Sequence, residues 1–171
     1  VAVAMYQSAD TISNLLESVL PQVSGKIELL VVDDGSTDGS VEAVQSVTTH
    51  AGPVRVVTHS SNQGLGPARN TAVIEAKGSY VMFVDSDDEV LPGSLTAITE
   101  RLELSQLDIL FIGAVEQKRG RDAPLHDPDT LTRLAGASEP WTLSTHPELL
   151  FFPPATWSKV FRRDFLRHEH I

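Results

Sequence analysis

Three carboxylates within four residues form the strongest candidate for chemistry in this chain, at positions 85 to 88 (Asp-Ser-Asp-Asp). Neighbouring carboxylates repel one another, so such a cluster is costly unless a cation or hydrogen-bond donors offset the repulsion. Oxygen ligands of this kind suit Mg²⁺ or Mn²⁺. The alternative is structural, because acids that precede the helix expected after Pro92 would also favour the start of that helix.

A second polar turn, Asp33 to Gly39, follows another apolar run. A carboxylate in such a turn can accept a hydrogen bond from a nucleobase N–H or from a ribose hydroxyl. Asp, Ser and Gly are also the residues that ordinary turns require. We interpret Asp33 mainly as a binding residue and residues 34–39 mainly as turn-forming.

Arg69 follows a loop that contains Gly64 and Gly66 and lies in the first turn of an expected helix. It could meet a phosphate or hold Asp85, or it could be an ordinary surface arginine. The loop lacks the third glycine of a dinucleotide-binding fingerprint, and no Gly-Lys-Ser/Thr phosphate loop occurs in the sequence.

Composition excludes several classes of function. The 171 residues include no cysteine, which excludes disulfides, thiolate metal sites and a cysteine nucleophile. The formal net charge of −10 argues against a nucleic acid partner, because that binding depends on clustered Lys and Arg. No apolar run approaches the length of a transmembrane segment. We therefore expect a cytoplasmic protein, which could work at the inner face of the membrane.

The elements that must position these residues alternate along the chain. Apolar runs predict strands at residues 1–6, 27–32, 54–57, 80–84 and 109–114, and helical spacing predicts helices around 12–20, 41–47, 67–77 and 92–102. This order predicts an α/β domain with a mostly parallel sheet flanked by helices. Tyr6, Asp33 and Asp85 each lie at or just after a strand end, which is where such sheets bind ligands. Residues 116–147 are expected to be irregular, with a short helix around 130–134.

Taken together, these segments resemble the family 2 glycosyltransferases, an inverting group with the Rossmann-like GT-A fold. Residues 31–40 (VVDDGSTDGS) resemble the nucleotide-binding turn of the family. Residues 62–70 (NQGLGPARN) resemble its N-x-G-x-x-x-A-R-N segment. Residues 76–88 resemble its A-x-G-x-Y strand and the DxD-type motif that follows. The resemblance extends from Val1 to about Gly93.

The resemblance implies a role for each candidate residue. Tyr6 would line the nucleoside pocket, and Asp33 would accept a hydrogen bond from the base, most often uracil. Asp87 would ligate Mn²⁺ or Mg²⁺ that bridges the diphosphate, and Asp85 would contact the ribose and the metal. The implied nucleotide-binding set is Tyr6, Asp33, Arg69, Asp85 and Ser86.

Residues 155–166 resemble the family's W-x-K-x-(Y/F)-R-R-x-F-L segment, which implies that Trp157 and Lys159 lie on the acceptor side. Trp157 could equally be a core aromatic. We expect residues 1–114 to form the donor-binding subdomain and residues 115–171 to be the truncated start of an acceptor-side subdomain. The catalytic base of the family is an acid downstream of this segment, so we expect it beyond Ile171 and nominate none here.

The function implied is metal-assisted, inverting transfer of a sugar from a nucleotide diphosphate donor, with UDP expected, to an unknown acceptor. A glycan, a lipid-linked or a teichoic-acid-type acceptor of the cell envelope is consistent with the stretch 147–166, which resembles domains fused to teichoic-acid-type glycerophosphotransferases. One alternative is a non-catalytic module that binds a nucleotide-sugar. Another is a sugar-phosphate nucleotidyltransferase, but residues 6–10 lack the Gly-rich basic loop that it requires.

Overall fold

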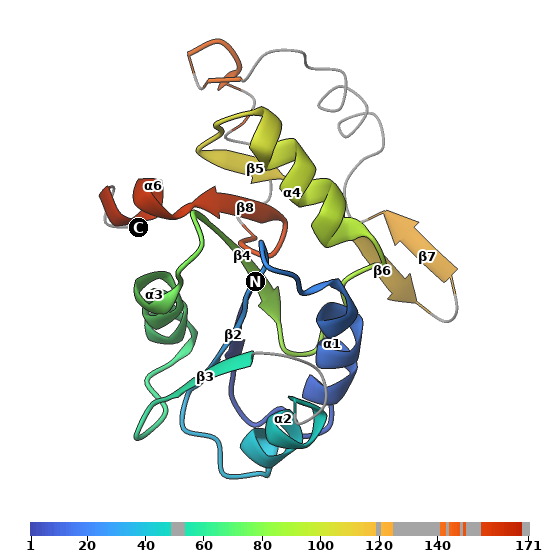
Figure 1. Ribbon diagram of the computed structural model, residues 1–171, viewed down its shortest axis with the longest axis vertical. Helices are drawn as coiled ribbons and strands as arrows, with labels where there is room; N and C mark the ends of the chain where they lie inside the picture. The colour runs from blue at the N-terminus through green and yellow to red at the C-terminus, as the bar shows by residue number, and fades with distance from the viewer. Residues whose placement is uncertain are drawn as a thin grey trace.

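A six-stranded sheet forms the centre of the molecule (Figure 1), in a computed structural model that describes residues 1–48, 54–118, 121–124, 141, 142, 144–147, 149 and 155–168. The strand order is β3-β2-β1-β4-β8-β5. The first four strands in this order are parallel, and β8 pairs antiparallel with both β4 and β5. The strands are β1 (Ala2–Met5), β2 (Leu29–Asp33), β3 (Val54–Thr58), β4 (Tyr80–Asp85), β5 (Ile109–Phe111) and β8 (Lys159–Arg162).

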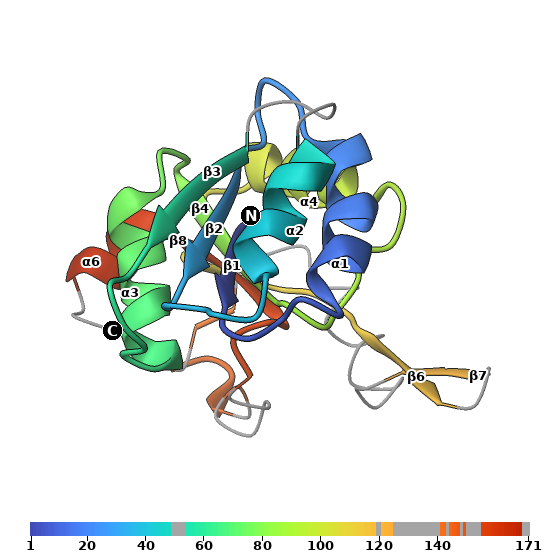
Figure 2. The ribbon, with the colours of Figure 1, turned by 90° about the horizontal axis from the view of Figure 1, so that it is seen from below.

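Helices cover both faces of this sheet, as Figure 2 shows with the sheet nearly edge-on. On one face lie α1 (Ile12–Val19), the 3₁₀ turn η1 (Leu20–Gln22), α2 (Ser40–Thr48) and α4 (Ser94–Leu104). On the other face lie α3 (Leu65–Glu75) and α6 (Arg163–His168). The predicted α/β class with a mostly parallel sheet is confirmed. None of the described helices is long and apolar enough to cross a membrane.

The two faces have separate cores because strand side chains alternate between them. Leu29 and Val31 of β2 pack toward α1 and α2, whereas Leu30 and Val32 pack toward α3. All four are at most 1% exposed, which explains why the predicted strand reads as one continuous apolar run. The side of α3 that packs against this face of the sheet is made of small residues, namely Ala68, Ala72 and Val73, with Ala76 directly after the helix.

Two features of the second half of the chain differ from expectation. The predicted irregular region 116–147 is wrong at its start, where β6 (Val115–Lys118) and β7 (Arg121–Pro124) form an antiparallel hairpin that projects from the body (Figure 2). These strands pair with each other rather than with the main sheet. They therefore lack the alternating apolar pattern from which a strand is predicted. The short helix expected around 130–134 lies outside the described residues.

The insertion of β8 between β4 and β5 is the second difference, because the sequence pattern predicts no strand at residues 159–162. Tyr80 pairs with Arg162 and Met82 with Val160 on one side, and Ile109 pairs with Phe161 on the other. The sheet therefore includes residues from both sides of position 114, where the sequence predicts a boundary between subdomains.

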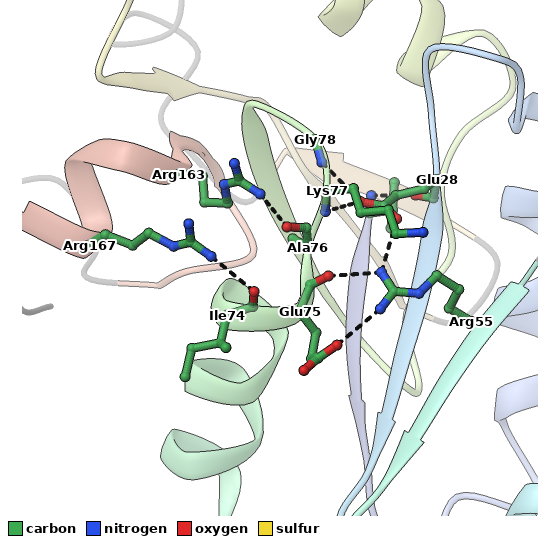
Figure 3. Close-up of polar contacts among 10 residues, drawn as sticks. Glu28, Arg55, Ile74, Glu75, Ala76, Lys77, Gly78, Arg163 and Arg167 are labelled. Atoms are coloured by element: carbon green, nitrogen blue, oxygen red, sulfur yellow. Dashed lines mark hydrogen bonds and ion pairs between the residues drawn. The ribbon is translucent and has the colours of Figure 1, made fainter.

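Two arginines of α6 cover the C-terminal end of α3 (Figure 3). The guanidinium of Arg163 donates to the carbonyl of Ala76, and that of Arg167 donates to the carbonyl of Ile74 at 2.9 Å. The last carbonyls of a helix have no partner within the helix, and positive charge is favourable at this end. These contacts therefore join α6 to α3.

A third arginine approaches the same helix end from β3 (Figure 3). Arg55 donates to the Glu75 carbonyl at 2.8 Å and to the Glu75 carboxylate at 3.0 Å. Glu28, which is 3.5 Å from Arg55, accepts hydrogen bonds from the backbone N–H groups of Lys77 and Gly78. The end of α3 and the turn into β4 are thus fixed to the strands.

Removing the Arg163 contact is expected to weaken the fold. We expect Arg163→Ala to lower the free energy of unfolding by about 1–2 kcal/mol, because a part-buried, charge-assisted hydrogen bond to a helix carbonyl is lost. Urea denaturation measures the change. Arg101→Ala is the control, since Arg101 is exposed in the last turn of α4, and it should change stability by less than about 0.5 kcal/mol. Equal stabilities for the two variants would contradict the prediction.

Candidate functional site

The ends of three neighbouring strands bring the candidate residues together. Met5 of β1 pairs with Asp33 of β2, and Ala4 pairs with Asp85 of β4, so the two aspartates flank the end of β1. Tyr6 follows β1 directly and is 47% exposed. This is the carboxyl edge of the parallel strands, where ligands bind in open α/β sheets.

Asp33 is fully buried, and its two carboxylate oxygens differ. Oδ1 accepts a hydrogen bond from the backbone N–H of Ser36 at 3.1 Å. Oδ2 is buried and has no hydrogen-bond partner in the part of the chain that the structure describes. A buried oxygen without a donor is costly, so this atom is suited to accept a hydrogen bond from a ligand.

Asp34 is also buried, but its carboxylate is occupied by neighbouring segments. His59 Nδ1 lies 2.6 Å from Oδ1, and the N–H groups of Gln63 and Gly64 donate to Oδ2 at 3.0 and 2.7 Å. Burial opposes ionisation, but the hydrogen bonds from His59 and from the two N–H groups outweigh it and lower the pKa of Asp34. This carboxylate ties the end of β2 to the loop before α3.

The close approach of that loop depends on a glycine. Gly35 has φ of +76°, and a Cβ atom there would lie 2.8 Å from the backbone carbonyl carbon of Ser61. A side chain would therefore clash with backbone that cannot easily move. His59 lies at the start of this loop, and its Nε2 lies 2.9 Å from the Thr71 hydroxyl on α3.

The acidic turn that follows β4 is only partly neutralised by protein groups. Arg69 of α3 donates to Asp85 Oδ1 at 2.7 Å, which fits one of the two roles predicted for Arg69. The exposed Asp87 makes no hydrogen bond or ion pair with any described residue. Partial burial raises the pKa of Asp88, and repulsion from Asp87 and Asp85 raises it further. The turn is therefore a site of uncompensated negative charge.

Ser86 joins this turn to the segment after β1. Its hydroxyl lies 2.8 Å from the hydroxyl of Ser8, whose backbone N–H donates to Ser40 Oγ at 2.8 Å. Gln7, in the same segment, has a positive φ of 51° and accepts a hydrogen bond from the N–H of Thr37 at 2.8 Å. The three turns at this edge are thus connected to one another.

The side chains fit a divalent cation that is held partly by its ligand. Within the described ranges, no three His, Asp or Glu side chains converge as a protein cage for a metal. Mg²⁺ is commonly bound through one or two carboxylates and the phosphates of a nucleotide, with water completing the shell. The free carboxylate of Asp87 and the adjacent Asp85 suit this mode of binding.

The predicted acceptor-side residues lie at the same edge of the sheet. Because β8 is antiparallel to β4, the turn that precedes β8 lies beside the end of β4. Trp157, in this turn, is half-buried. Lys159 is 9% exposed, and burial lowers the pKa of its amine. The amine donates to the Ala155 carbonyl at 2.6 Å and lies 5.4 Å from the Phe111 ring centroid.

A cavity of about 780 Å³ lies at the other end of the strands. Its walls include Glu28, Lys77, Leu102 and Val160, but none of the predicted site residues. Ligands of parallel sheets bind at the carboxyl ends of the strands, so we assign the candidate site to the edge that carries Asp33 and Asp87.

Sequence reasoning missed two side chains that organise this edge. His59 lies between Asp34 and Thr71 and contacts both. Because it follows β3 directly, the expectation that site residues follow strand ends could have identified it. Gln22 binds the backbone that follows the acidic turn, and no sequence pattern connects residues so far apart.

Comparison with known proteins identifies the family. A family model described as glycosyl transferase family 2 matches residues 1–156. The chain belongs to this family. The glycosyltransferase EpsJ of Bacillus subtilis, described as uncharacterized, is 30% identical over 171 residues, and succinoglycan biosynthesis protein ExoO of Rhizobium meliloti is 31% identical over 173 residues. The matches cover 100% and 99% of this chain but 49% of each relative, so the chain spans about half the length of the curated relatives it matches.

Solved structures agree with the family assignment. The crystal structure of S. aureus TarS residues 1–349 has a TM-score of 0.78 at 27% identity, over 99% of this chain and 48% of that one. The same protein in complex with UDP-GlcNAc has a TM-score of 0.76, over 99% and 46%. The mannosyltransferase PcManGT from Pyrobaculum calidifontis, solved with GDP-Man and Mn²⁺, has a TM-score of 0.70 at 21% identity, over 98% and 45%, which shows the fold alone. The GT-A fold inferred from the sequence is confirmed.

The lowered pKa of Asp34 predicts a pH-dependent loss of stability. Its stabilisation is complete above the ordinary aspartate pKa of about 3.9 and is lost as the pH falls through the lower folded-state pKa. We expect Asp34→Asn to cost about 2 kcal/mol at about pH 7, with the difference from wild type shrinking below about pH 4. Urea denaturation of both proteins at several pH values measures this difference.

Asp87→Asn is the control, because Asp87 has no partner among the described residues, and it should show no such loss. A wild-type advantage that is constant down to about pH 3 would contradict the assignment.

Proposed function

We propose that this chain binds a UDP-sugar together with Mn²⁺ or Mg²⁺ and supports inverting transfer of the sugar to an acceptor. One observation carries the proposal. A buried aspartate oxygen without a donor, at Asp33, lies at the end of β2, and a carboxylate without a partner among the described residues, at Asp87, lies in the turn after β4; both strands flank β1. The first suits a nucleobase N–H and the second suits a cation on the diphosphate.

The base lies beside Asp33 in this proposal, with Tyr6 forming the exposed wall of the nucleoside pocket. Asp33 Oδ2 accepts from the imide N–H of uracil, while Oδ1 remains bound to the N–H of Ser36. The TarS structure with UDP-GlcNAc, at 27% identity over 99% of the chain, supports a uridine donor. The base must supply an N–H donor, because an ionised carboxylate can only accept hydrogen bonds.

The diphosphate lies over the acidic turn, where its charge would otherwise be repelled. A divalent cation supplies positive charge that stabilises the departing nucleotide diphosphate as the glycosidic bond breaks. Asp87 ligates this cation, and Asp85 contacts the ribose and the cation while Arg69 holds its Oδ1. Ser86 contributes its hydroxyl to the nucleotide side of the turn.

Residues 1–114 carry donor binding in this scheme, and the segment 155–159 faces the acceptor beside the end of β4. Trp157 forms part of that surface, and the largely buried Lys159 supports it. The succinoglycan biosynthesis protein among the relatives supports a glycan acceptor of the cell envelope, with lipid-linked and teichoic-acid-type acceptors as members of the same class. The base that takes the acceptor proton lies outside the residues assigned here.

The metal role predicts that UDP binding depends on a cation. Calorimetry should show tighter binding of UDP with Mn²⁺ than in EDTA, and Asp87→Ala should abolish this difference while leaving the protein folded, because Asp87 is exposed in a turn. Glu89→Ala is the matched control, an exposed acid two residues away that should retain the metal dependence. Equal affinity of the wild type with Mn²⁺ and in EDTA would remove the metal from the proposal.

The base-reading role of Asp33 predicts a loss of affinity rather than mainly of stability. We expect Asp33→Ala to weaken UDP binding by about 1–3 kcal/mol, as loss of a charge-assisted hydrogen bond does. Asp34→Ala should instead lower the melting temperature, because its carboxylate binds His59 and backbone N–H groups. Calorimetry and thermal melting of both variants separate the roles. The reverse pattern would mean that the two aspartates have been assigned the wrong way round.

A further inference from the structure

The backbone that follows the acidic turn is held by two side chains from α1 and η1, about 70 residues earlier in the chain. Ser18 of α1 accepts a hydrogen bond from the N–H of Val90 at 3.0 Å. Gln22 of η1 donates from Nε2 to the carbonyl of Leu91 at 3.2 Å, and its Oε1 accepts from the N–H of Leu95 at 3.2 Å. The amide of Gln22 therefore uses its donor on the loop before α4 and its acceptor on the first turn of α4.

One of these bonds replaces a missing helix cap. The residue before α4 is Gly93, which has a left-handed conformation with φ of 79° and no side chain to bind the first N–H groups of the helix. Those N–H groups have no partner within a helix and need one from elsewhere. Gln22 supplies it from another element, because Leu95 is the second residue of α4.

The acidic turn is anchored on its other side as well. Arg69 holds Asp85 at 2.7 Å, and the Ser8 hydroxyl lies 2.8 Å from the Ser86 hydroxyl. Between these anchors and Val90 lie only three residues, and the side chains of Asp87 and Glu89 are exposed. The position of the Asp87 carboxylate is therefore set by two anchors upstream and by the bonds from Ser18 and Gln22 downstream.

We propose that Gln22 is a positioning residue for the metal-binding acidic turn. The inference rests on the proposed metal role of Asp87. Within the described residues, the side chain of Gln22 hydrogen-bonds backbone atoms beyond the turn and the carbonyl of Ser18, and it would touch neither nucleotide nor cation. Loss of the Gln22 side chain would let the backbone of residues 90–95 move. The Asp87 carboxylate would then spend less time in the position where it can share a cation with the diphosphate. Outer partners of this kind commonly contribute about 10- to 100-fold to metal affinity.

The test is a calorimetric titration of UDP across a Mn²⁺ series on the folded protein. For Gln22→Ala we expect the Mn²⁺ concentration that gives half-maximal UDP binding to rise about tenfold, with UDP affinity in EDTA unchanged. Gln106→Ala is the matched control, because Gln106 is exposed and its side chain makes no hydrogen bond with any described residue, and it should behave as wild type. A merely structural role would lower the melting temperature and the folded fraction without moving the Mn²⁺ midpoint.

Ser18→Ala is the second variant, since it removes the separate bond from the N–H of Val90 on the same segment and keeps the test available if Gln22→Ala fails to fold. It should move the Mn²⁺ midpoint in the same direction by a smaller factor. A wild-type protein with Mn²⁺-dependent binding and a Gln22→Ala variant with the same midpoint would overturn the positioning role alone. A wild-type protein without Mn²⁺ dependence would overturn the proposed metal role and this inference with it. An unchanged Ser18→Ala midpoint, where Gln22→Ala does not fold, would also overturn the inference.

Discussion

The carboxylate of Asp34 is the interaction on which the arrangement of the site depends. A buried charge must find donors, and Asp34 obtains them from His59 and from the backbone that leads into α3. These bonds fix where α3 starts, and Arg69 lies one turn further along that helix. The burial of an acid just after β2 therefore helps to place Arg69 beside Asp85 of β4. Removing the donors would weaken the anchor at the start of α3 and, through Arg69, one of the anchors of the acidic turn.

Unequal neutralisation of the acids gives the site its chemical character. Among the described residues, protein donors bind both carboxylate oxygens of the buried Asp34, and Ala9 and Ser40 do the same for Asp38. Asp33 keeps one oxygen without a donor, Asp85 has a single arginine contact, and Asp87 has no partner among the described residues. In a chain of net charge −10, an anionic ligand is therefore accepted more readily with a cation than alone.

Much of the first half of the fold was predictable, because buried parallel strands leave continuous apolar runs and each run ends in polar residues. The edge that carries Asp33 and Asp85 follows from that pattern alone. The sequence could not show which oxygen of Asp33 lacks a donor, since that depends on how the turn folds back. It could not place β8 or Gln22 either, because the strand pairing and the hydrogen bonds involved connect residues 48 to 82 positions apart. Local periodicity contains no record of such contacts.

The position of β8 constrains the order in which the sheet can be assembled. The strands β1 to β4 lie next to one another and all lie within the first 85 residues, so their pairing does not depend on the rest of the chain. One edge of β4 then has no partner until residues 159–162 follow, and β5 cannot join the sheet before them because it contacts β8 alone. Late pairing across a long stretch of chain slows folding and exposes a strand edge to other molecules. Until residues 159–162 join the sheet, its parallel part is therefore open at the strand that carries Asp85 as well as at β3.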